Sequence, residues 1–362
     1  MGMHSKSRVL ILYTGGTFGM EIKQSPQGNL TSLSIPHLSN PVLKKRFKKQ
    51  VPELKKIAHC DVEIIMNRDS SHIGSDEWIQ MALTIQKKWD KYDGIVILHG
   101  TDTLAYTASA LSFLLRPCKK PVILTGAQRP LSALRTDARN NLISSVELAA
   151  QKASHSHPST AQVMVFFGNT LFQGNRIRKQ SSIDFNAFES PQAIPLAITG
   201  TTIRSLPKAQ RTPVEKLSKS KLVPQFSSKV LMCHITPGFP SEVLSKEVLS
   251  SLDALILVAF LSRTAPTNDP GFIKLIRRAR KLEIPVILTT EEGSNSAQLA
   301  HHLKEEKTQY SVEAELFAEG CLWSGSMTPE CAYVKASLIA GQPKGRSKFK
   351  TLWKENLAHE SF

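Results

Sequence analysis

Short apolar runs of strand length recur along the first half of the chain, and each is followed by a polar loop. These runs occupy Val9–Leu12, Gly94–Leu98, Pro121–Gly126 and Val163–Phe167. A continuous apolar run bounded by polar residues indicates a strand that is buried on both faces of a parallel sheet. Helical periodicity separates the runs, as in Trp78–Tyr92. The alternation therefore predicts an α/β fold built on a mostly parallel sheet.

A second set of strands and helices follows a region in which this alternation stops. Its apolar runs are Val230–Ile235, Ala254–Ala259 and Pro285–Thr289. Between the two sets, residues 196–228 contain three prolines and six basic residues. We predict a larger N-terminal domain over residues 1–195, a basic linker over 196–228 and a smaller C-terminal α/β domain over 229–362.

Local signals predict further elements. Helical periodicity with a basic face predicts one helix over Pro41–Ile57. Thr328 as the N-cap, with Pro329 after it, predicts the start of the last helix, which Gly341 ends. The polar, turn-rich segment Phe18–Leu33 is interpreted as a flap over a binding site.

Composition narrows the class of protein. A chain of 362 residues is long enough for two full cores. It has no run of 18 apolar residues and no secretory signal, so we expect no membrane partner. The five cysteines are scattered and include no CxxC, which fits reduced thiols in the cytosol. We therefore predict a cytoplasmic protein and expect no metal site.

The chain is strongly basic, with 46 basic and 30 acidic residues and a net charge of +16. Such a charge can attract nucleic acid. However, the basic residues are spread along the chain, few aromatic residues lie among them, and no cluster matches a known binding module. We therefore do not expect nucleic acid as a partner.

The loops after the first two strands carry residues suited to acyl transfer. Backbone N–H groups beside Gly15 and Gly100 can hold an oxyanion, because glycine lets the backbone approach a ligand closely. A threonine hydroxyl needs a base before it attacks a carbonyl. Lys179 can be that base for Thr101, with Asp102 orienting it.

Other interpretations of the same loops stay open at this point. A Gly-Gly turn also fits a tight turn without chemistry. The chain lacks GxxxxGK[ST] and GxGxxG, which argues against a nucleotide site. His99, before Gly100, is interpreted as a packing or hydrogen-bonding residue and not as a base. From the residues alone, acyl transfer is one arrangement among several.

Two motifs, Tyr13–Thr17 and Leu98–Ala110, make the chain resemble the L-asparaginase family in its bacterial cytoplasmic type I form. Pro121–Gly126 with Arg135–Asp137, and Gly174–Lys179, continue the match. The resemblance spans nearly the whole chain and is densest up to about Pro191. It implies a two-domain asparaginase-like fold.

The resemblance also implies a reaction, the hydrolysis of asparagine to aspartate and ammonia through a threonine acyl-enzyme. It implies no metal or cofactor, weak activity on glutamine, and a homodimer or homotetramer. Thr14 would be the nucleophile, and Thr101, Asp102 and Lys179 would form a second triad. Ser70 would hold the substrate carboxylate and Asp102 its ammonium group. The full set of implied substrate contacts is Gly15, Ser70, Ser71, Gly100, Thr101 and Asp102.

The chain departs from the family pattern in three places. Relatives carry a catalytic tyrosine in the flap, whereas the flap here has Gln27–Leu30. Tyr310, in the second domain, is the candidate substitute. Phe260–Thr264 stands where relatives have a glycine-rich loop that contains asparagine. Glu291 stands near the position of a cysteine linked to allosteric asparagine binding, so the resemblance supports the active site more than an allosteric one.

Two competing functions also remain. One is the asparaginase-like subunit of a tRNA-dependent amidotransferase, which releases ammonia for a partner. The other is a catalytically weakened amino-acid-binding protein that has lost the flap tyrosine. Retention of Thr14, Thr101, Asp102 and Lys179 argues against the second, because a binder has no need of a buried lysine.

Overall fold

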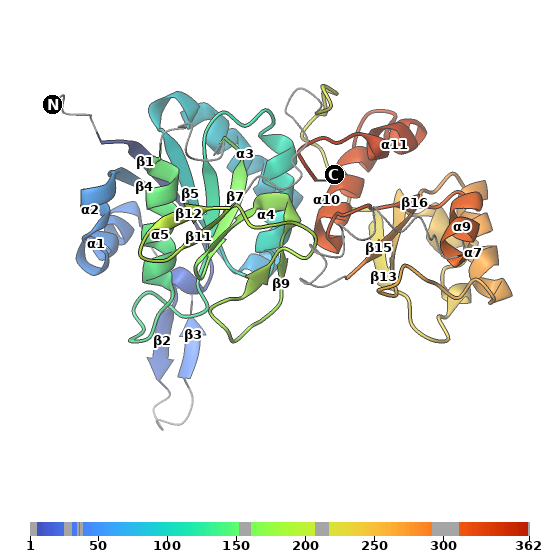
Figure 1. The fold of residues 1–362 in the computed structure, drawn as a ribbon, viewed down its shortest axis with the longest axis horizontal. Coiled ribbons are helices and arrows are strands. Elements are labelled where there is room, and N and C mark those ends of the chain that lie inside the picture. The colour runs from blue at the N-terminus through green and yellow to red at the C-terminus, as the bar shows by residue number, and fades with distance from the viewer. Residues whose placement is uncertain are drawn as a thin grey trace. The chain divides into compact units, whose positions relative to one another are not determined.

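The computed structural model describes residues 6–24, 31–34, 36, 39–151, 161–206, 217–291 and 311–360. The chain divides into two compact units (Figure 1). The first comprises Met1–Ser190 and Ile194–Ala209, and the second comprises Pro191–Ala193 and Gln210–Phe362. The predicted α/β class, with a larger N-terminal part and a smaller C-terminal part, is confirmed.

An eight-stranded sheet in the order β12-β11-β8-β7-β6-β5-β1-β4 forms the centre of the first unit. From β4 to β7 all neighbours are parallel, and β8, β11 and β12 extend the sheet through antiparallel pairs. The predicted mostly parallel sheet is therefore confirmed. Its strands are β1 (Arg8–Gly15), β4 (His59–Arg68), β5 (Gly94–Leu98), β6 (Val122–Thr125), β7 (Val163–Phe167), β8 (Thr170–Gln173), β11 (Ala197–Thr199) and β12 (Ile203–Ser205).

Both faces of this sheet are buried, as its continuous apolar strands predict. Val9 and Ile11 of β1 share a core with Leu142 of α5, whereas the alternate residues Leu10 and Leu12 are buried on the opposite face. The helices of this unit are α1 (Asn40–Gln50), α2 (Leu54–Ile57), α3 (Ser75–Lys88), α4 (Leu104–Leu114) and α5 (Ala138–Ala150). The 3₁₀ turns in the described part of this unit are η1 (Thr17–Gly19), η2 (Ser70–His72), η3 (Trp89–Lys91) and η4 (Gly174–Arg176).

Two antiparallel hairpins stand apart from the main sheet. One pairs β9 (Arg178–Lys179) with β10 (Phe188–Glu189). The other pairs β2 (Glu21–Gln24) with β3 (Thr31–Ser34), within the segment predicted to be a flap. Arg46 of α1 holds the base of this second hairpin, because it donates to the Gly19 carbonyl (3.2 Å) and pairs with Glu21 (2.7 Å).

A four-stranded parallel sheet in the order β13-β14-β15-β16 forms the centre of the second unit. Leu255 and Leu257 of β14 pack with Phe272 and Ile276 of α7 in its core. The strands are β13 (Val230–His234), β14 (Ala254–Ala259), β15 (Val286–Thr290) and β16 (Leu322–Trp323). The helices are η6 (Ser241–Val243), α6 (Lys246–Ser250), α7 (Pro270–Lys281), α9 (Ser311–Ala318), α10 (Pro329–Ala340) and α11 (Gly345–Lys354).

The expected linker over 196–228 differs from the structure. Its start forms β11 and β12, which belong to the first sheet. Its end lies against the second unit, where the Val223 N–H donates to Gln342 (2.7 Å) and the Ser227 N–H donates to the Ser337 carbonyl (2.9 Å). Strands of three residues are too short for periodicity to predict, and the prolines and basic residues suggested a linker instead.

Two helix predictions were also wrong. The expected helix Pro41–Ile57 is two helices, because Pro52 follows the end of α1 and cannot continue its hydrogen-bond ladder. The helix ending at Gly341 is not the last one, since α11 follows it. Helix α11 was missed because its apolar residues are embedded in a basic stretch.

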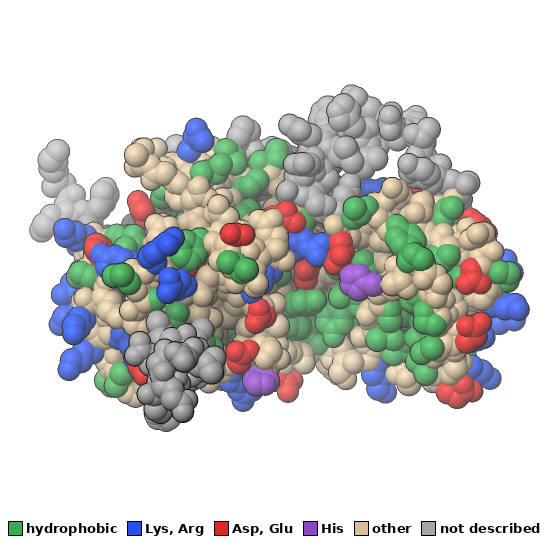
Figure 2. All heavy atoms as spheres, turned by 90° about the horizontal axis from the view of Figure 1, so that it is seen from below, with side chains coloured by type: hydrophobic (Ala, Val, Ile, Leu, Met, Phe, Trp, Pro, Cys, Tyr) green, Lys and Arg blue, Asp and Glu red, His purple; other side chains and the backbone are tan. Residues whose placement is uncertain are grey.

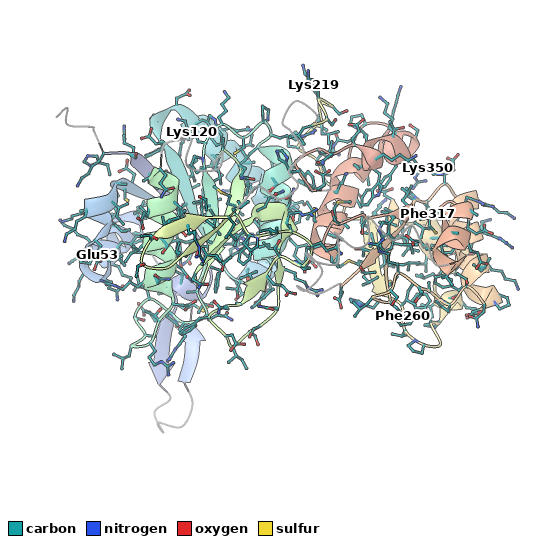
Figure 3. The ribbon with its side chains drawn as sticks, viewed as in Figure 1. Glu53, Lys120, Lys219, Phe260, Phe317 and Lys350 are labelled. Atoms are coloured by element: carbon teal, nitrogen blue, oxygen red, sulfur yellow. The ribbon has the colours of Figure 1, made fainter. Side chains whose placement is uncertain are left out.

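Basic side chains of the first unit gather over α1, which carries Lys44, Lys45, Arg46, Lys48 and Lys49 (Figure 2). Other lysines lie elsewhere, such as Lys120 before β6 and Lys350 on α11 (Figure 3). Among the described helices, none is long and apolar enough to cross a membrane.

Candidate active site

The candidate site lies where three neighbouring parallel strands end. In the sheet register Tyr13 of β1 pairs with Leu98 of β5, and Leu98 pairs with Thr125 of β6. The loops that follow these residues therefore leave the same edge of the sheet. In open α/β sheets this carboxyl edge is where ligands bind.

Close contacts between glycines bring the loops together. Gly15 and Gly16 have φ values of 115° and 76°, which side-chain-bearing residues rarely adopt. A Cβ atom on Gly16 would lie 2.4 Å from the Gly100 Cα, and one on Gly100 would lie 2.6 Å from the Ser70 Oγ. The loops after β1, β4 and β5 are thus in direct contact. Only glycine fits at positions 16 and 100.

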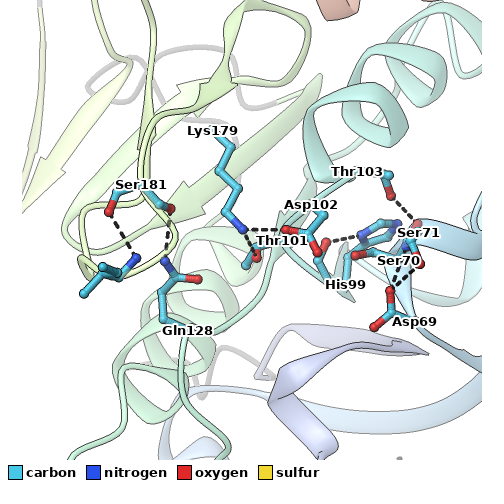
Figure 4. A network of polar contacts seen from close by, with 12 residues as sticks. Asp69, Ser70, Ser71, His99, Thr101, Asp102, Thr103, Gln128, Lys179 and Ser181 are labelled. Atoms are coloured by element: carbon cyan, nitrogen blue, oxygen red, sulfur yellow. Dashed lines mark hydrogen bonds and ion pairs between the residues drawn. The ribbon is translucent and has the colours of Figure 1, made fainter. Parts of the chain in front are cut away.

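Thr101, Asp102 and Lys179 meet at this edge (Figure 4). The Lys179 Nζ donates to the Thr101 Oγ1 at 2.7 Å and contacts the Asp102 Oδ1 at 2.7 Å. Lys179 reaches them from β9, 77 residues further along the chain than Asp102. The side chain of Lys179 is 19% exposed and that of Asp102 is 67% exposed. A hydroxyl, an amine and a carboxylate therefore form one connected group with an open side.

Ser70 and Ser71 lie in the neighbouring turn η2. Ser70 is buried, and its carbonyl accepts a hydrogen bond from Thr103 (2.7 Å), which ties the turn to the start of α4. Ser71 is exposed and bonds to Asp69 through its N–H (2.9 Å) and its hydroxyl (2.7 Å). These two bonds lower the pKa of the Asp69 carboxyl. Asp69 thus remains a carboxylate and shapes the turn beside Gly100.

The structure separates the two threonines of the first loop. Thr14 is completely buried, and its hydroxyl donates to the Leu98 carbonyl at 2.9 Å. A substrate cannot reach this hydroxyl, so the structure does not support the assignment of Thr14 as the nucleophile. Thr17, after the two glycines, is partly exposed and begins η1. Because Gly16 contacts Gly100, Thr17 follows directly on the contact between the two loops.

Tyr310, the candidate substitute for the flap tyrosine, lies outside the described residues. Tyr13, at the end of β1, is fully buried, and a Cβ atom on Gly19 would lie 2.0 Å from its hydroxyl. Burial raises the pKa of Tyr13 to about 12, so this phenol stays protonated at neutral pH.

Metal binding finds no support in the described part of the chain, which contains no group of three or more His, Cys, Asp or Glu residues placed to hold a metal ion. The site instead offers hydroxyls, an amine, a carboxylate and backbone amides. This set can take up and release protons and can hold an oxyanion.

Comparison with known proteins identifies the family of the chain. The family model described as "Asparaginase, N-terminal" matches residues 8–247. The chain belongs to the asparaginase family. It is 32% identical to L-asparaginase 1 of Escherichia coli (strain K12) over 358 residues, which cover 98% of each chain. The matched region of this asparaginase-family protein includes Thr17, Ser70, the Thr101–Asp102 pair and Lys179.

A solved structure gives a similar result. L-asparaginase I from Vibrio cholerae O1 superposes with a TM-score of 0.80 at 31% identity, covering 99% of this chain and 100% of the other. A more distant relative has another role in its name. It is one of the subunits of the glutamyl-tRNA(Gln) amidotransferase of Saccharolobus islandicus, and it is 26% identical, covering 98% of this chain and 76% of the relative. Family membership alone therefore leaves more than one function to consider.

Proposed function

We propose that the protein hydrolyses L-asparagine to L-aspartate and ammonia. The observation that carries this proposal is the position of the Lys179 Nζ, 2.7 Å from both Thr101 and Asp102 at the carboxyl edge of the sheet. The names of its relatives support asparagine as the substrate. Weak hydrolysis of glutamine, which has the same amide on a longer chain, is part of the proposal.

The proposed reaction uses a threonine ester. The Thr17 hydroxyl attacks the side-chain amide carbon, a C–O bond forms, the C–N bond breaks, and the nitrogen leaves as ammonia after taking up a proton. Water then attacks the ester, which releases aspartate and restores the hydroxyl. Lys179 and Thr101 accept and return the protons, and Asp102 holds the lysine in place. Thr17 takes the role expected of Thr14 because only Thr17 is accessible.

The same residues account for binding of a zwitterionic amino acid. The side chain of Asp102 is largely exposed, so its carboxylate can accept hydrogen bonds from the substrate ammonium group as well as from Lys179. The Ser70 hydroxyl, which lies beside Gly100, is the proposed donor to the substrate carboxylate, since the N–H and the hydroxyl of Ser71 already bond to Asp69. The Thr101 N–H, directly after Gly100, is the proposed donor to the developing oxyanion, because the Gly16 N–H already donates to the Arg68 carbonyl (3.1 Å).

Ammonia release from L-asparagine and L-glutamine by the purified protein tests the proposal. Lys179→Met should lower kcat on asparagine by about a thousandfold, because it removes the amine that moves the protons. Lys88→Met is the matched control, since Lys88 forms a surface pair of the same length (2.7 Å) with Glu63. Equal activity in the two variants, or no ammonia from the wild-type protein, would contradict the proposal.

The name of the amidotransferase relative favours one alternative, an ammonia-releasing subunit that works for a partner. Such a subunit should release little ammonia from free amino acids until the partner and its tRNA are added. A catalytically weakened binder should bind asparagine without releasing any ammonia. A cytoplasmic location remains a prediction from the scattered cysteines.

A further inference from the structure

His99 lies fully buried next to the reacting group, and the proposed reaction assigns it no part. Its Nδ1 lies 2.7 Å from the Gly100 carbonyl oxygen, and its Nε2 lies 3.0 Å from the Thr107 Oγ1. The Trp78 Nε1 donates to the same Thr107 hydroxyl at 3.0 Å. The contacts form a continuous chain from α3 through α4 to the loop after β5.

The chemistry of these partners fixes the protonation of the ring. An indole N–H can only donate, so the Thr107 hydroxyl accepts from Trp78. A carbonyl can only accept, so the His99 Nδ1 must carry a proton toward Gly100. Burial lowers the pKa of His99 to about 4, so the neutral ring carries only that proton at pH 7. Nε2 is therefore unprotonated and accepts the Thr107 hydroxyl proton.

The hydrogen bond from the His99 Nδ1–H to the Gly100 carbonyl orients the peptide unit that joins Gly100 to Thr101. In a trans peptide the N–H points opposite to the C=O, so the Thr101 N–H points away from the imidazole. The backbone before Gly100 is also held, because the His99 N–H donates to the Thr125 carbonyl at 2.8 Å. Gly100 has no side chain of its own to restrain it. The His99 ring restrains it through the hydrogen bond to its carbonyl.

We propose that His99 is a positioning residue, whose Nδ1–H holds the Gly100–Thr101 peptide unit so that Thr101 stays aligned with Lys179. The inference rests on the proposed function, because it requires Thr101 to act in the reaction. A displacement of about 1 Å at a reacting group can cost about 100-fold in rate. A single hydrogen bond to the backbone at this point therefore has a measurable effect on catalysis.

Two substitutions separate positioning from packing. His99→Leu removes the donor, whereas the amide of His99→Asn can place an N–H close to the Nδ1 position. We expect His99→Leu to lower kcat by about 100-fold with little change in KM, and His99→Asn to stay within about 10-fold of the wild-type value. Full activity in His99→Leu, or an equal loss in both variants with their folds intact, would overturn the proposal.

The protonation state of the ring gives a readout that does not depend on turnover. In protein labelled with ¹⁵N at histidine, NMR should show the His99 ring neutral and protonated at Nδ1. Thr107→Val should keep the proton on Nδ1, because the Gly100 carbonyl still accepts it, and should shift the Nε2 resonance, because Nε2 loses its donor. A ring protonated at Nε2 in an active enzyme would overturn the role of His99 and leave the proposed function standing. Wild-type protein that hydrolyses neither amide would overturn the proposed function, and with it this role.

Discussion

At the scale of single residues, the site depends on three side chains in contact and on a turn that buries Thr14 and leaves Thr17 partly exposed. Thr101, Asp102 and Lys179 were predicted to act together, and the structure places them in contact. The sequence does not distinguish Thr14 from Thr17, because each is a threonine beside a glycine. Only the turn at Gly15 and Gly16 decides which of them is buried. Periodicity cannot resolve that difference, since it depends on φ values above zero.

Burial of His99 should make stability depend on pH. The pKa of His99 is about 4 in the folded protein and 6.5 in an unfolded chain. Between these values the unfolded chain binds a proton that the folded protein excludes. The free energy of unfolding should therefore fall as the pH drops from 6.5 to 4, by about 1.4 kcal/mol per pH unit.

Urea unfolding of the wild-type protein and of His99→Asn at several pH values checks this expectation. The variant lacks the titrating ring but keeps every carboxyl group and the other histidines. The difference between the two plots of unfolding free energy against pH therefore isolates His99. The difference should be constant above pH 6.5, change between pH 6.5 and 4, and level off below pH 4. Parallel curves over the whole range would contradict the assignment of a buried, neutral His99.

At the scale of elements, the C-terminal segment is attached to α10 by a buried ion pair. The Lys335 Nζ lies 2.7 Å from the Glu360 Oε1, and the two side chains are 1% and 0% exposed. Lys335 also donates to the carbonyls of Trp353 (2.8 Å) and Glu355 (2.7 Å). Glu360 accepts from the Leu357 N–H at 2.9 Å. One lysine of α10 therefore holds both the end of α11 and the segment after it.

Removal of the lysine alone should be strongly destabilising. Lys335→Met removes the ammonium group that lies 2.7 Å from the buried Glu360 carboxylate, which should lower the free energy of unfolding by about 3–5 kcal/mol. The double variant Lys335→Met with Glu360→Leu should recover much of this loss, because no charge remains buried. Chemical denaturation of the three proteins measures both effects.

Lys88→Met is the control for this pair. It breaks an ion pair of the same length whose side chains are 30% and 32% exposed, and it should cost about 1 kcal/mol or less. A Lys335→Met protein as stable as this control would show that the buried pair does not hold the C-terminal segment.

The strands of the parallel sheets were predicted closely, because continuous apolar runs such as Gly94–Leu98 and Ala254–Ala259 coincide with β5 and β14. The antiparallel additions were not predicted. β11 and β12 have three residues each, and their place in the sheet depends on pairing with β8, which no local pattern specifies. Element boundaries followed proline and cap signals: the Cys331 N–H donates to the predicted N-cap Thr328 at 3.3 Å.

At the scale of the whole molecule, two loops beside the site expose apolar side chains. Leu134 and Ile183 are 101% and 84% exposed. Gln128 joins their loops by donating to the carbonyls of Ser181 (3.1 Å) and Asp184 (3.2 Å). Exposed apolar side chains on neighbouring loops are typical of contact surfaces. They add support to the prediction of a homodimer or homotetramer.

Light scattering during size-exclusion chromatography tests that prediction. We expect a mass of two or four times 40.0 kDa for the wild-type protein. Leu134→Asp combined with Ile183→Asp should reduce it, because burial of two carboxylates at an apolar contact is unfavourable. A wild-type mass of one chain at working concentration would contradict the oligomer.

The most direct test of the account compares ammonia release from L-asparagine by the wild-type protein, Thr17→Val and Thr14→Val. We predict that Thr17→Val loses about a thousandfold or more in kcat, because it removes the attacking oxygen. Thr14→Val should keep its activity within about 10-fold and lose stability by about 1–2 kcal/mol, because it removes a buried hydrogen bond. Turnover that survives in Thr17→Val, or that disappears in a folded Thr14→Val protein, would contradict the proposed site.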